Sequence, residues 1–299
     1  MNTAEAAVGK WHGILKHFGM DEDQLSGRHQ SCPNCEGKDR FRFADQEGRG
    51  NYYCSGCGHG DGFDLAKMIS GKGFKDIAQE IDQIVGNIKM GQVVGTDYSR
   101  SKSLLDGISK ELKPVGNEVR QYLHNRGLSP AKHMRQHNNL GYYEDGKKAG
   151  YYPAMVCRIS TPTGELATYH CTYLHNGKKA EVRASKKLMP VCAPTRGGAI
   201  RLTDIYEHIG LAEGVETAIA VMKLHKVPCW ATATSGLMES FELPEGVKSV
   251  TIYGDNDANY AGQKSAYILA NKLAMKGITA DVVLPAIIGD WADVVEGSK

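Results

Sequence analysis

The sequence predicts a multi-domain protein of mixed α+β and α/β class. Three observations support this: two Cys-x-x-Cys pairs near the N-terminus, a middle region of short strands and turns, and alternating strands and helices at the end. The 299 residues are enough for two or three separate cores. We expect domains at 1–85, 117–202 and 203–299, joined by a linker at 86–116, where small polar residues show no sustained period.

The two cysteine pairs predict that the first domain is a zinc ribbon with flanking helices. Cys32 and Cys35 form one pair, and Cys54 and Cys57 form the other after eighteen intervening residues. No secretory signal is visible, so a reducing compartment is expected, in which such pairs bind metal rather than form disulfides. Four thiolates complete a tetrahedral Zn²⁺ site and leave no position for substrate, so the zinc is structural. An alternative in which His59 replaces one cysteine stays open.

The hairpin between the cysteine pairs mixes basic and aromatic residues, as in DRFRF. Strand alternation places Arg40 and Arg42 on one face and Phe41 and Phe43 on the other. We interpret the phenylalanines as the small core of the ribbon. Arg40, Arg42 and the nearby Arg49 are candidate contacts to single-stranded nucleic acid, which needs cations for its phosphates beside aromatic rings for its bases.

The middle of the chain is strongly basic, although the whole chain has a net charge of only +2. Residues 98–202 carry 18 basic and 7 acidic side chains, a net charge of +11, whereas 1–97 and 203–299 are net acidic. This excess favours a polyanionic partner. The preferred candidates for binding template or nucleotide are Arg158, Lys186 and Lys187. The weaker candidates are Arg126, Lys178, Lys179 and Arg183, and His170 is either a nucleotide contact or a structural histidine.

The C-terminal domain alternates strands and helices, which predicts a small α/β domain with a mostly parallel sheet. Its carboxylates follow the strands: Glu213 after IGLA, Asp255 and Asp257 after VTIYG, and Asp290 and Asp293 after the last strand. Because the carboxyl ends of parallel strands meet at one edge of a sheet, we expect these groups to converge. Converging carboxylates are the ligands that Mg²⁺ takes. Each of them taken singly is equally explained as a turn or helix-capping residue.

These motifs resemble known replication proteins. Glu-Gly at one strand end, Asp-x-Asp at a later one and a further Asp motif are similar to the Toprim domain of DnaG-type primases, topoisomerases and some nucleases. The paired Cys-x-x-Cys motifs with DRFRF and GRGNYYC resemble the zinc-binding domain of phage and plasmid primases. The stretches YPAMVCRI, TGELATYHCTYL, KKLM and GGAIRL resemble the segment before Toprim in those proteins. The resemblance covers roughly 28–64 and 140–297.

The resemblance implies a DNA primase, which joins ribonucleotides on single-stranded DNA by metal-dependent nucleotidyl transfer in phage, plasmid or mobile-element replication. It assigns Asp255 and Asp257 as the main ligands of Mg²⁺ or Mn²⁺, and Glu213 as a further ligand or the group that handles the 3′-hydroxyl proton. Asp290 and Asp293 complete the metal shell. The implied fold is a zinc ribbon followed by a basic subdomain and a Toprim domain.

The implied partners are a single-stranded DNA template, ribonucleoside triphosphates and a replicative helicase. The chain ends six residues after Asp293 and contains no GxxxxGK[ST] phosphate loop, so the helicase is expected to act in trans. No apolar run long enough to cross a membrane is present, so we expect no membrane partner. The expected location is the cytoplasm of a bacterial or phage-infected cell.

Two other classes of function remain open from the sequence. The same carboxylates suit a Toprim nuclease or topoisomerase-like enzyme. A non-catalytic mediator of recombination, which binds DNA through the ribbon with an idle Toprim domain, is the third hypothesis. The set of Glu213, Asp255 and Asp257 argues against an idle site, because nothing else in a binding module requires all three.

Overall fold

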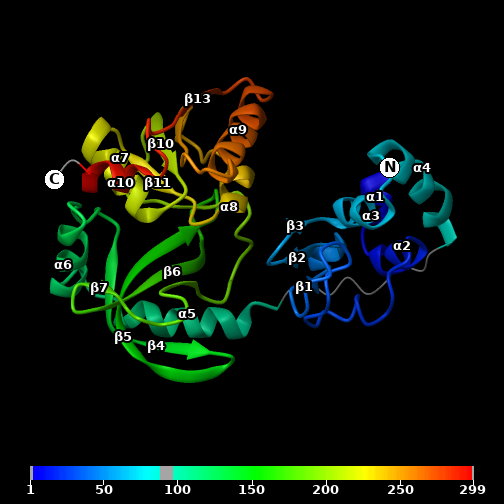
Figure 1. Cartoon of the computed structure of the whole chain (residues 1–299), viewed down its shortest axis with the longest axis horizontal. Coiled ribbons are helices and arrows are strands. Elements are labelled where there is room, and N and C mark those ends of the chain that lie inside the picture. The colour runs from blue at the N-terminus through cyan, green and yellow to red at the C-terminus, as the bar shows by residue number, and fades with distance from the viewer. Residues whose placement is uncertain (1–2, 88–96, 298–299) are drawn as a thin grey trace. The chain divides into compact units, whose positions relative to one another are not determined.

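The computed structural model describes residues 3–87 and 97–297, and it divides into two compact units, Met1–Asp97 and Tyr98–Lys299 (Figure 1). The first unit contains a three-stranded antiparallel sheet in the order β1-β2-β3, surrounded by short helices. Its strands are β1 (Phe41–Phe43), β2 (Tyr52–Cys54) and β3 (Gly58–Gly60). Its helices are α1 (Thr3–Ala7), α2 (Trp11–His17), η1 (Gln46–Gly48), α3 (Gly62–Ser70), α4 (Phe74–Ile84) and η2 (Val85–Asn87).

The core of the first unit forms where α2, α3 and α4 pack around the ribbon. Phe41 and Phe43 are almost fully buried in this core, as the alternation in DRFRF predicted. Trp11 lies directly against Gly62, where an added Cβ would come within 2.2 Å of the indole ring. Only glycine therefore lets α3 begin this close to α2. Asp61 and Asp64 cap the start of α3 with a reciprocal capping box.

The second unit is built on one continuous ten-stranded sheet. Its path runs β13-β12-β10-β11-β9-β5-β6-β7, with β4 also pairing with β5, and β8 with β6. The strands of the antiparallel half are β4 (Arg135–Glu144), β5 (Lys147–Ser160), β6 (Leu166–His175), β7 (Lys178–Lys179) and β8 (Lys186–Leu188). The remaining strands are β9 (Ala199–Ile200), β10 (His208–Ala212), β11 (Cys229–Ala231), β12 (Ser249–Tyr253) and β13 (Thr279–Val283).

The short strand β9 joins the two halves of this sheet. It pairs antiparallel with β5 on one side and with β11 on the other. Beyond β11 every pairing is parallel, which confirms the predicted α/β domain with a mostly parallel sheet. The helices of this part are α7 (Val215–His225), α8 (Ser235–Ser240), α9 (Ala261–Ala274) and α10 (Trp291–Gly297).

Helices α5 (Ser99–Glu111) and α6 (Asn117–Asn125) cover opposite faces of the antiparallel half (Figure 1). Leu105 of α5 packs in one core with Val156 of β5, whereas Leu123 of α6 packs in another with Cys157. Neighbouring residues of a strand point to opposite faces, so the sheet separates the two cores.

Part of the predicted linker at 86–116 is the helix α5 in the structure. Residues 99–111 are helical, with Leu105 and Ile108 buried against the sheet. This helix was not predicted because its apolar residues form only a narrow stripe among serines and charged residues. Residues 88–96, which also belong to the predicted linker, lie outside the described residues. Across 3–87 and 97–297, no helix combines the length and apolar character needed to span a bilayer.

Candidate functional site

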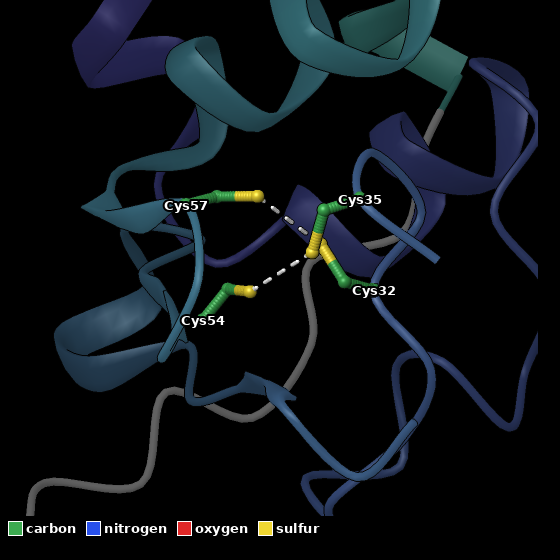
Figure 2. Close-up of side chains that lie close together, drawn as sticks. All are labelled: Cys32, Cys35, Cys54 and Cys57. Carbon is green, nitrogen blue, oxygen red and sulfur yellow. Dashed lines mark hydrogen bonds between the residues drawn. The ribbon is translucent and has the colours of Figure 1, made fainter. Parts of the chain in front are cut away.

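The four predicted cysteine ligands converge on one point (Figure 2). Cys32 and Cys35 come from the turn before β1, and Cys54 and Cys57 flank the turn between β2 and β3. The Sγ atoms of Cys32 and Cys57 are 3.7 Å apart, as are those of Cys35 and Cys54. Four sulfurs at about 2.3 Å from a tetrahedral Zn²⁺ lie ~3.8 Å from one another, so the thiols fit this metal.

Hydrogen bonds around the thiols support their role as ligands. The backbone N–H of Gly56 donates to Cys54 Sγ, and Asn34 Nδ2 donates to Cys57 Sγ, both at 3.4 Å. A backbone hydrogen bond at Gly37 lowers the pKa of Cys35 to about 7. Such donors stabilise thiolates and orient them toward a metal. His59 is not part of this set, which contradicts the alternative that it replaces a cysteine.

The solvent face of the ribbon carries a row of three exposed side chains, one on each strand. Arg42 on β1 is paired with Tyr53 on β2, which is paired in turn with His59 on β3. Directly paired residues point to the same face, so the three lie side by side. The ring of Tyr53 is 52% exposed, whereas Phe41 on the opposite face is fully buried. A cation beside an accessible ring suits single-stranded nucleic acid.

The other two predicted arginines of the ribbon lie outside this row. Arg40 packs its stem against Gly37, and its guanidinium lies near the Cys35 knuckle. Arg49 follows η1 and pairs with the exposed Glu47 at 3.5 Å. Sequence reasoning identified Arg42 but missed Tyr53 and His59 as its neighbours, because the register that aligns the three strands is not visible in the sequence.

In the second unit, two parallel strands bring the predicted carboxylates to one edge of the sheet. Ala212 of β10 is paired with Tyr253 of β12, and Glu213 and Asp255 follow these strand ends. Asp257 is fixed just beyond, where its Oδ2 accepts a hydrogen bond of 2.9 Å from the backbone N–H of Gly262. A Cβ on Gly262 would approach the Asp255 carbonyl oxygen to 2.8 Å, so glycine lets α9 start against this loop.

The electrostatics of this edge are those of a cation site. Burial, together with the charges of Asp290, Glu213, Asp257 and Asp293, raises the pKa of Asp255 to about 7. Burial and Asp257 likewise raise the pKa of Glu213. The Oδ1 atom of Asp255 is buried without a hydrogen-bond partner. Clustered carboxylates with an unsatisfied buried oxygen match the hard, oxygen-only ligand set of Mg²⁺ or Mn²⁺.

The carboxylates are spaced more widely than the thiols. Within the described ranges, only the four cysteines bring at least three ligand atoms within 4.8 Å of one another. Mg²⁺ keeps several of its waters and uses one or two protein carboxylates, so a wider spacing suits it.

Asp290 and Asp293 both form hydrogen bonds that start helix α10. Asp290 Oδ1 accepts from the backbone N–H groups of Ala292 and Asp293, at 2.6 and 3.0 Å. Asp293 Oδ2 accepts from the backbone N–H of Asp290 at 2.9 Å. This reciprocal capping gives each residue a structural role beside any role at the metal. Both side chains nevertheless lie close enough to raise the pKa of Asp255.

An ion pair with one buried partner connects the basic strands to the carboxylate edge. Lys186 Nζ on β8 lies 2.9 Å from Glu216 Oε2 on α7, and Tyr122 donates a hydrogen bond of 2.7 Å to Glu216 Oε1. Glu216 is only 2% exposed, and burial, the largest single effect, raises its pKa. The charge of Lys186 and the hydrogen bonds from Lys186 and Tyr122 together outweigh burial and lower the pKa to about 2. Lys186 is also close enough to oppose the raised pKa of Glu213.

Two more basic side chains, Arg126 and Lys179, lie near the Lys186–Glu216 ion pair. Arg126 Nη1 lies 3.8 Å from Glu216 Oε1, and its Nε bonds Glu296 at 2.5 Å. Burial lowers the pKa of Lys179, whose neighbours include Lys186 and Asp290. Of the predicted weaker candidates, Arg126 therefore lies beside Glu216 and Lys179 lies near Asp290. The charged Glu216 within the apolar stretch VETAIAV was the sequence signal for this network, and it was overlooked.

The sheet separates the three preferred basic candidates. Lys186 and Lys187 are consecutive on β8, so their side chains leave opposite faces. Arg158 is paired with Tyr169, whereas the neighbouring pair joins Cys157 to His170 on the Glu216 side. The ammonium of Lys187 donates to the Tyr143 carbonyl and lies over the Tyr142 ring, whereas that of Lys186 pairs with Glu216. The three residues therefore do not form a single basic surface.

His170 lies buried in the sheet beside Lys186. Burial, followed by the Lys186 charge, lowers its pKa to about 4, so the ring is neutral near pH 7. Its Nδ1 is buried without a partner. Cys157, paired with it across the strands, is also buried. Both of the predicted roles for His170, structural or nucleotide-binding, remain compatible with this placement.

Three family models match successive parts of the chain. Residues 27–63 match the zinc-binding domain of primase-helicase, and residues 208–298 match the Toprim domain. Residues 99–202 match a domain of unknown function, DUF7146. The chain thus combines a primase-helicase type of zinc ribbon with a Toprim domain, as the motifs predicted.

Several solved structures are similar to this chain at low identity. The zinc-binding and RNA polymerase domains of the Aquifex aeolicus primase match 99% of this chain and 82% of theirs, with 14% identity and a TM-score of 0.47. The primase fragment of the bacteriophage T7 primase-helicase protein matches 90% of this chain and 94% of its own, with 14% identity and a TM-score of 0.38. A DnaG primase catalytic domain bound to single-stranded DNA matches 67% and 76%, with 14% identity and a TM-score of 0.43.

Proposed function

We propose that this chain, with its primase-helicase type of zinc ribbon and its Toprim domain, is a DNA primase. It would synthesise short RNA primers on single-stranded DNA in phage, plasmid or mobile-element replication. The observation that carries the proposal is the juxtaposition of Glu213, Asp255 and Asp257 with the basic side chain of Lys186. Nucleotidyl transfer needs both signs of charge at one place, because a metal and a triphosphate must bind together.

In this proposal Asp255, Asp257 and Glu213 hold divalent metal. Bound Mg²⁺ or Mn²⁺ supplies charge stabilisation for the attacking and leaving oxygens of the transfer. Glu213, whose pKa is raised by burial, is placed to act as a ligand or to accept the 3′-hydroxyl proton. Asp290 and Asp293 complete the negative field from the start of α10.

Basic side chains at the same edge bind the triphosphate of the incoming ribonucleotide. Lys186 is held by Glu216, has a side chain that is 39% exposed, and lies close enough to Glu213 to affect its pKa. Lys179, exposed on β7 and close enough to Asp290 for its pKa to respond to that charge, adds a second positive charge. A lysine fixed by a buried carboxylate loses little conformational entropy when the triphosphate arrives, so it orients the phosphates efficiently.

The ribbon contacts the single-stranded template. Its exposed row of Arg42, Tyr53 and His59 offers a phosphate contact and a stacking ring on one face. The zinc keeps this face rigid, because the four thiols fix the turns at both ends of the hairpin. Strand separation would come from a replicative helicase in trans, and the place of action would be the cytoplasm of a bacterial or phage-infected cell.

A primer-synthesis assay tests the proposal. The zinc-replete protein is incubated with single-stranded DNA, Mg²⁺ or Mn²⁺ and labelled ribonucleotides, and the products are separated by size. We expect short RNA products that are lost in Asp257→Asn and retained in the control Asp281→Asn, which removes an equal charge from an exposed position on β13. Shortened DNA without RNA would identify a nuclease, and DNA binding without chemistry a recombination mediator.

A further inference from the structure

A second concentration of positive charge surrounds a pocket that the proposed chemistry does not use. The pocket has a volume of about 580 Å³ and lies in the second unit, between the end of α5 and strands β4, β5 and β9. Its basic rim is formed by Arg135, Arg158 and Arg201. Its apolar wall is formed by Val156, Tyr169 and Ile200. This size and mixed lining are typical of a site for a small polar ligand or part of a larger one.

The three arginines are held in place by backbone carbonyl groups. Arg158 Nη2 donates to the carbonyl of Gly164 at 2.7 Å, and Arg135 Nη1 donates to the carbonyl of Met134 at 2.8 Å. Arg201 Nη2 donates to the carbonyls of Thr161 and Pro162, at 3.0 and 2.8 Å. A guanidinium has five N–H donors, so each arginine is oriented and still has donors for a ligand.

No carboxylate neutralises this rim among the ion pairs of the described residues. Asp204, the acidic side chain in the lining, already pairs with Lys132 at 2.5 Å and His133 at 3.0 Å. Burial, and then the charge of Arg158, lowers the pKa of Arg201. Guanidinium groups held together without a counter-charge repel one another, and a bound anion relieves that repulsion.

The pocket is distinct from the carboxylate edge. Arg158 lies on the face of the β5–β6 pair opposite to that of His170, which senses Lys186 and Glu216. The pocket is also lined by the 203–205 loop, which leads into the start of β10, whereas Glu213 follows the end of that strand. A strand of this length spans ~16 Å. A ligand in the pocket therefore does not occupy the metal site.

We propose that Arg135, Arg158 and Arg201 form a phosphate-binding pocket. Guanidinium groups match phosphate oxygens in a bidentate geometry, and the apolar wall of Val156, Tyr169 and Ile200 accepts the sugar or base attached to the phosphate. The phosphate comes from a free nucleotide or from the backbone of a single strand. The pocket binds without divalent metal, because its positive charge comes from the protein alone.

Binding measurements without divalent cation test this proposal, and their result does not depend on whether the protein synthesises primers. Fluorescently labelled oligo-dT and, separately, a fluorescent ATP analogue are titrated with the zinc-replete protein in low salt without Mg²⁺. We expect the double variant Arg135→Gln/Arg158→Gln to weaken binding of one probe or both at least tenfold. The control Arg120→Gln, at an exposed position on α6, should change binding less than twofold.

The two probes identify the source of the phosphate. Loss of oligo-dT binding alone assigns the pocket to the strand backbone, and loss of ATP binding alone assigns it to a free nucleotide. Unchanged binding of both probes by a folded double variant overturns the proposal. Arg158→Lys is the check on geometry: it keeps the charge but not the planar fork, so its affinity should lie between wild type and the double variant.

Discussion

Lys186 and Glu216 form an ion pair in which one partner is buried and the other reaches solvent. Glu216 is 2% exposed and Lys186 is 39% exposed, with 2.9 Å between Nζ and Oε2. The buried carboxylate cannot move away, so the lysine takes its position from Glu216, with Tyr122 bonding the second carboxylate oxygen. Glu216 is therefore a positioning residue for a lysine that faces the carboxylate edge.

The first prediction concerns stability at low pH. The pKa of Glu216 falls from 4.5 to about 2 on folding, so its charged form stabilises the protein above pH 4.5, and this stabilisation is lost as the pH falls toward 2. Between pH 6 and pH 3 wild type should lose about 2 kcal/mol of unfolding free energy more than Glu216→Gln does. Urea denaturation of both proteins at several pH values measures this difference. The exposed control Glu245→Gln should follow wild type, and parallel pH profiles for wild type and Glu216→Gln would contradict the prediction.

The second prediction concerns the use of the ribonucleotide. If Glu216 positions Lys186, Glu216→Gln should raise KM for ribonucleotides about tenfold and change kcat much less. A tenfold change corresponds to about 1.4 kcal/mol, typical for a charged contact that is weakened but not removed. Steady-state primer synthesis gives both constants. A kcat reduced at unchanged KM would instead indicate that Glu216 acts on the chemical step.

The third prediction concerns Asp255 in the absence of divalent cation. Its folded pKa of about 7 lies above the ordinary aspartate value of 3.8, so the charged carboxylate destabilises the fold most above pH 7, and this cost disappears as the pH falls below 4. Asp255→Asn should therefore raise the unfolding free energy by about 4 kcal/mol at pH 8 and by about 2 kcal/mol at pH 5. Thermal unfolding in Mg²⁺-free buffer measures this.

Added Mg²⁺ provides the companion measurement. It should raise the Tm of wild type but not that of Asp255→Asn, because only wild type retains the ligand. An Asp255→Asn variant that is less stable than wild type at pH 8 would show that the carboxylate is held by interactions other than repulsion.

The fourth prediction concerns the zinc ribbon. Cys54→Ser should lose the bound zinc, unfold the first unit and impair the choice of start sites, while the second unit still unfolds cooperatively. Zinc content and circular dichroism with thermal unfolding report the two units. The matched control is Cys192→Ser, whose thiol donates to the Leu166 carbonyl outside the cluster, and it should retain the zinc. Priming at the same sites in wild type and Cys54→Ser would contradict a recognition role for the ribbon.

The fifth prediction concerns the exposed ring of the ribbon. Stacking on an aromatic side chain contributes about 1–3 kcal/mol per base, so Tyr53→Ala should weaken binding of single-stranded DNA by about 5- to 150-fold. Tyr53→Phe keeps the ring and should bind as wild type does. Fluorescence anisotropy with a labelled oligonucleotide measures both. Equal affinity of Tyr53→Ala and wild type would assign template binding to another surface.

The sequence predicted those features whose signal is local. Two Cys-x-x-Cys pairs and the carboxylates after apolar strands are each readable within a few residues, and the structure brings together the cysteines around Cys32 and the carboxylates around Asp255. The assignment of the carboxylates to metal stays a prediction. The sequence could not show that Arg158 and Lys187 lie on one face of the sheet and Lys186 on the other, because the face on which a residue lies depends on register with distant strands. Their role in binding stays a prediction.

The two residues of β9 also determine how the second unit can be divided. A fragment that begins at residue 203 contains the carboxylates but leaves the edge of β11 without its partner. An unpaired edge of buried, apolar residues such as Trp230 offers backbone donors and acceptors to any other strand, and it invites self-association. The half of the second unit that carries the carboxylates is therefore not a self-contained fragment: to keep the edge of β11 paired, it must include Ala199 and Ile200.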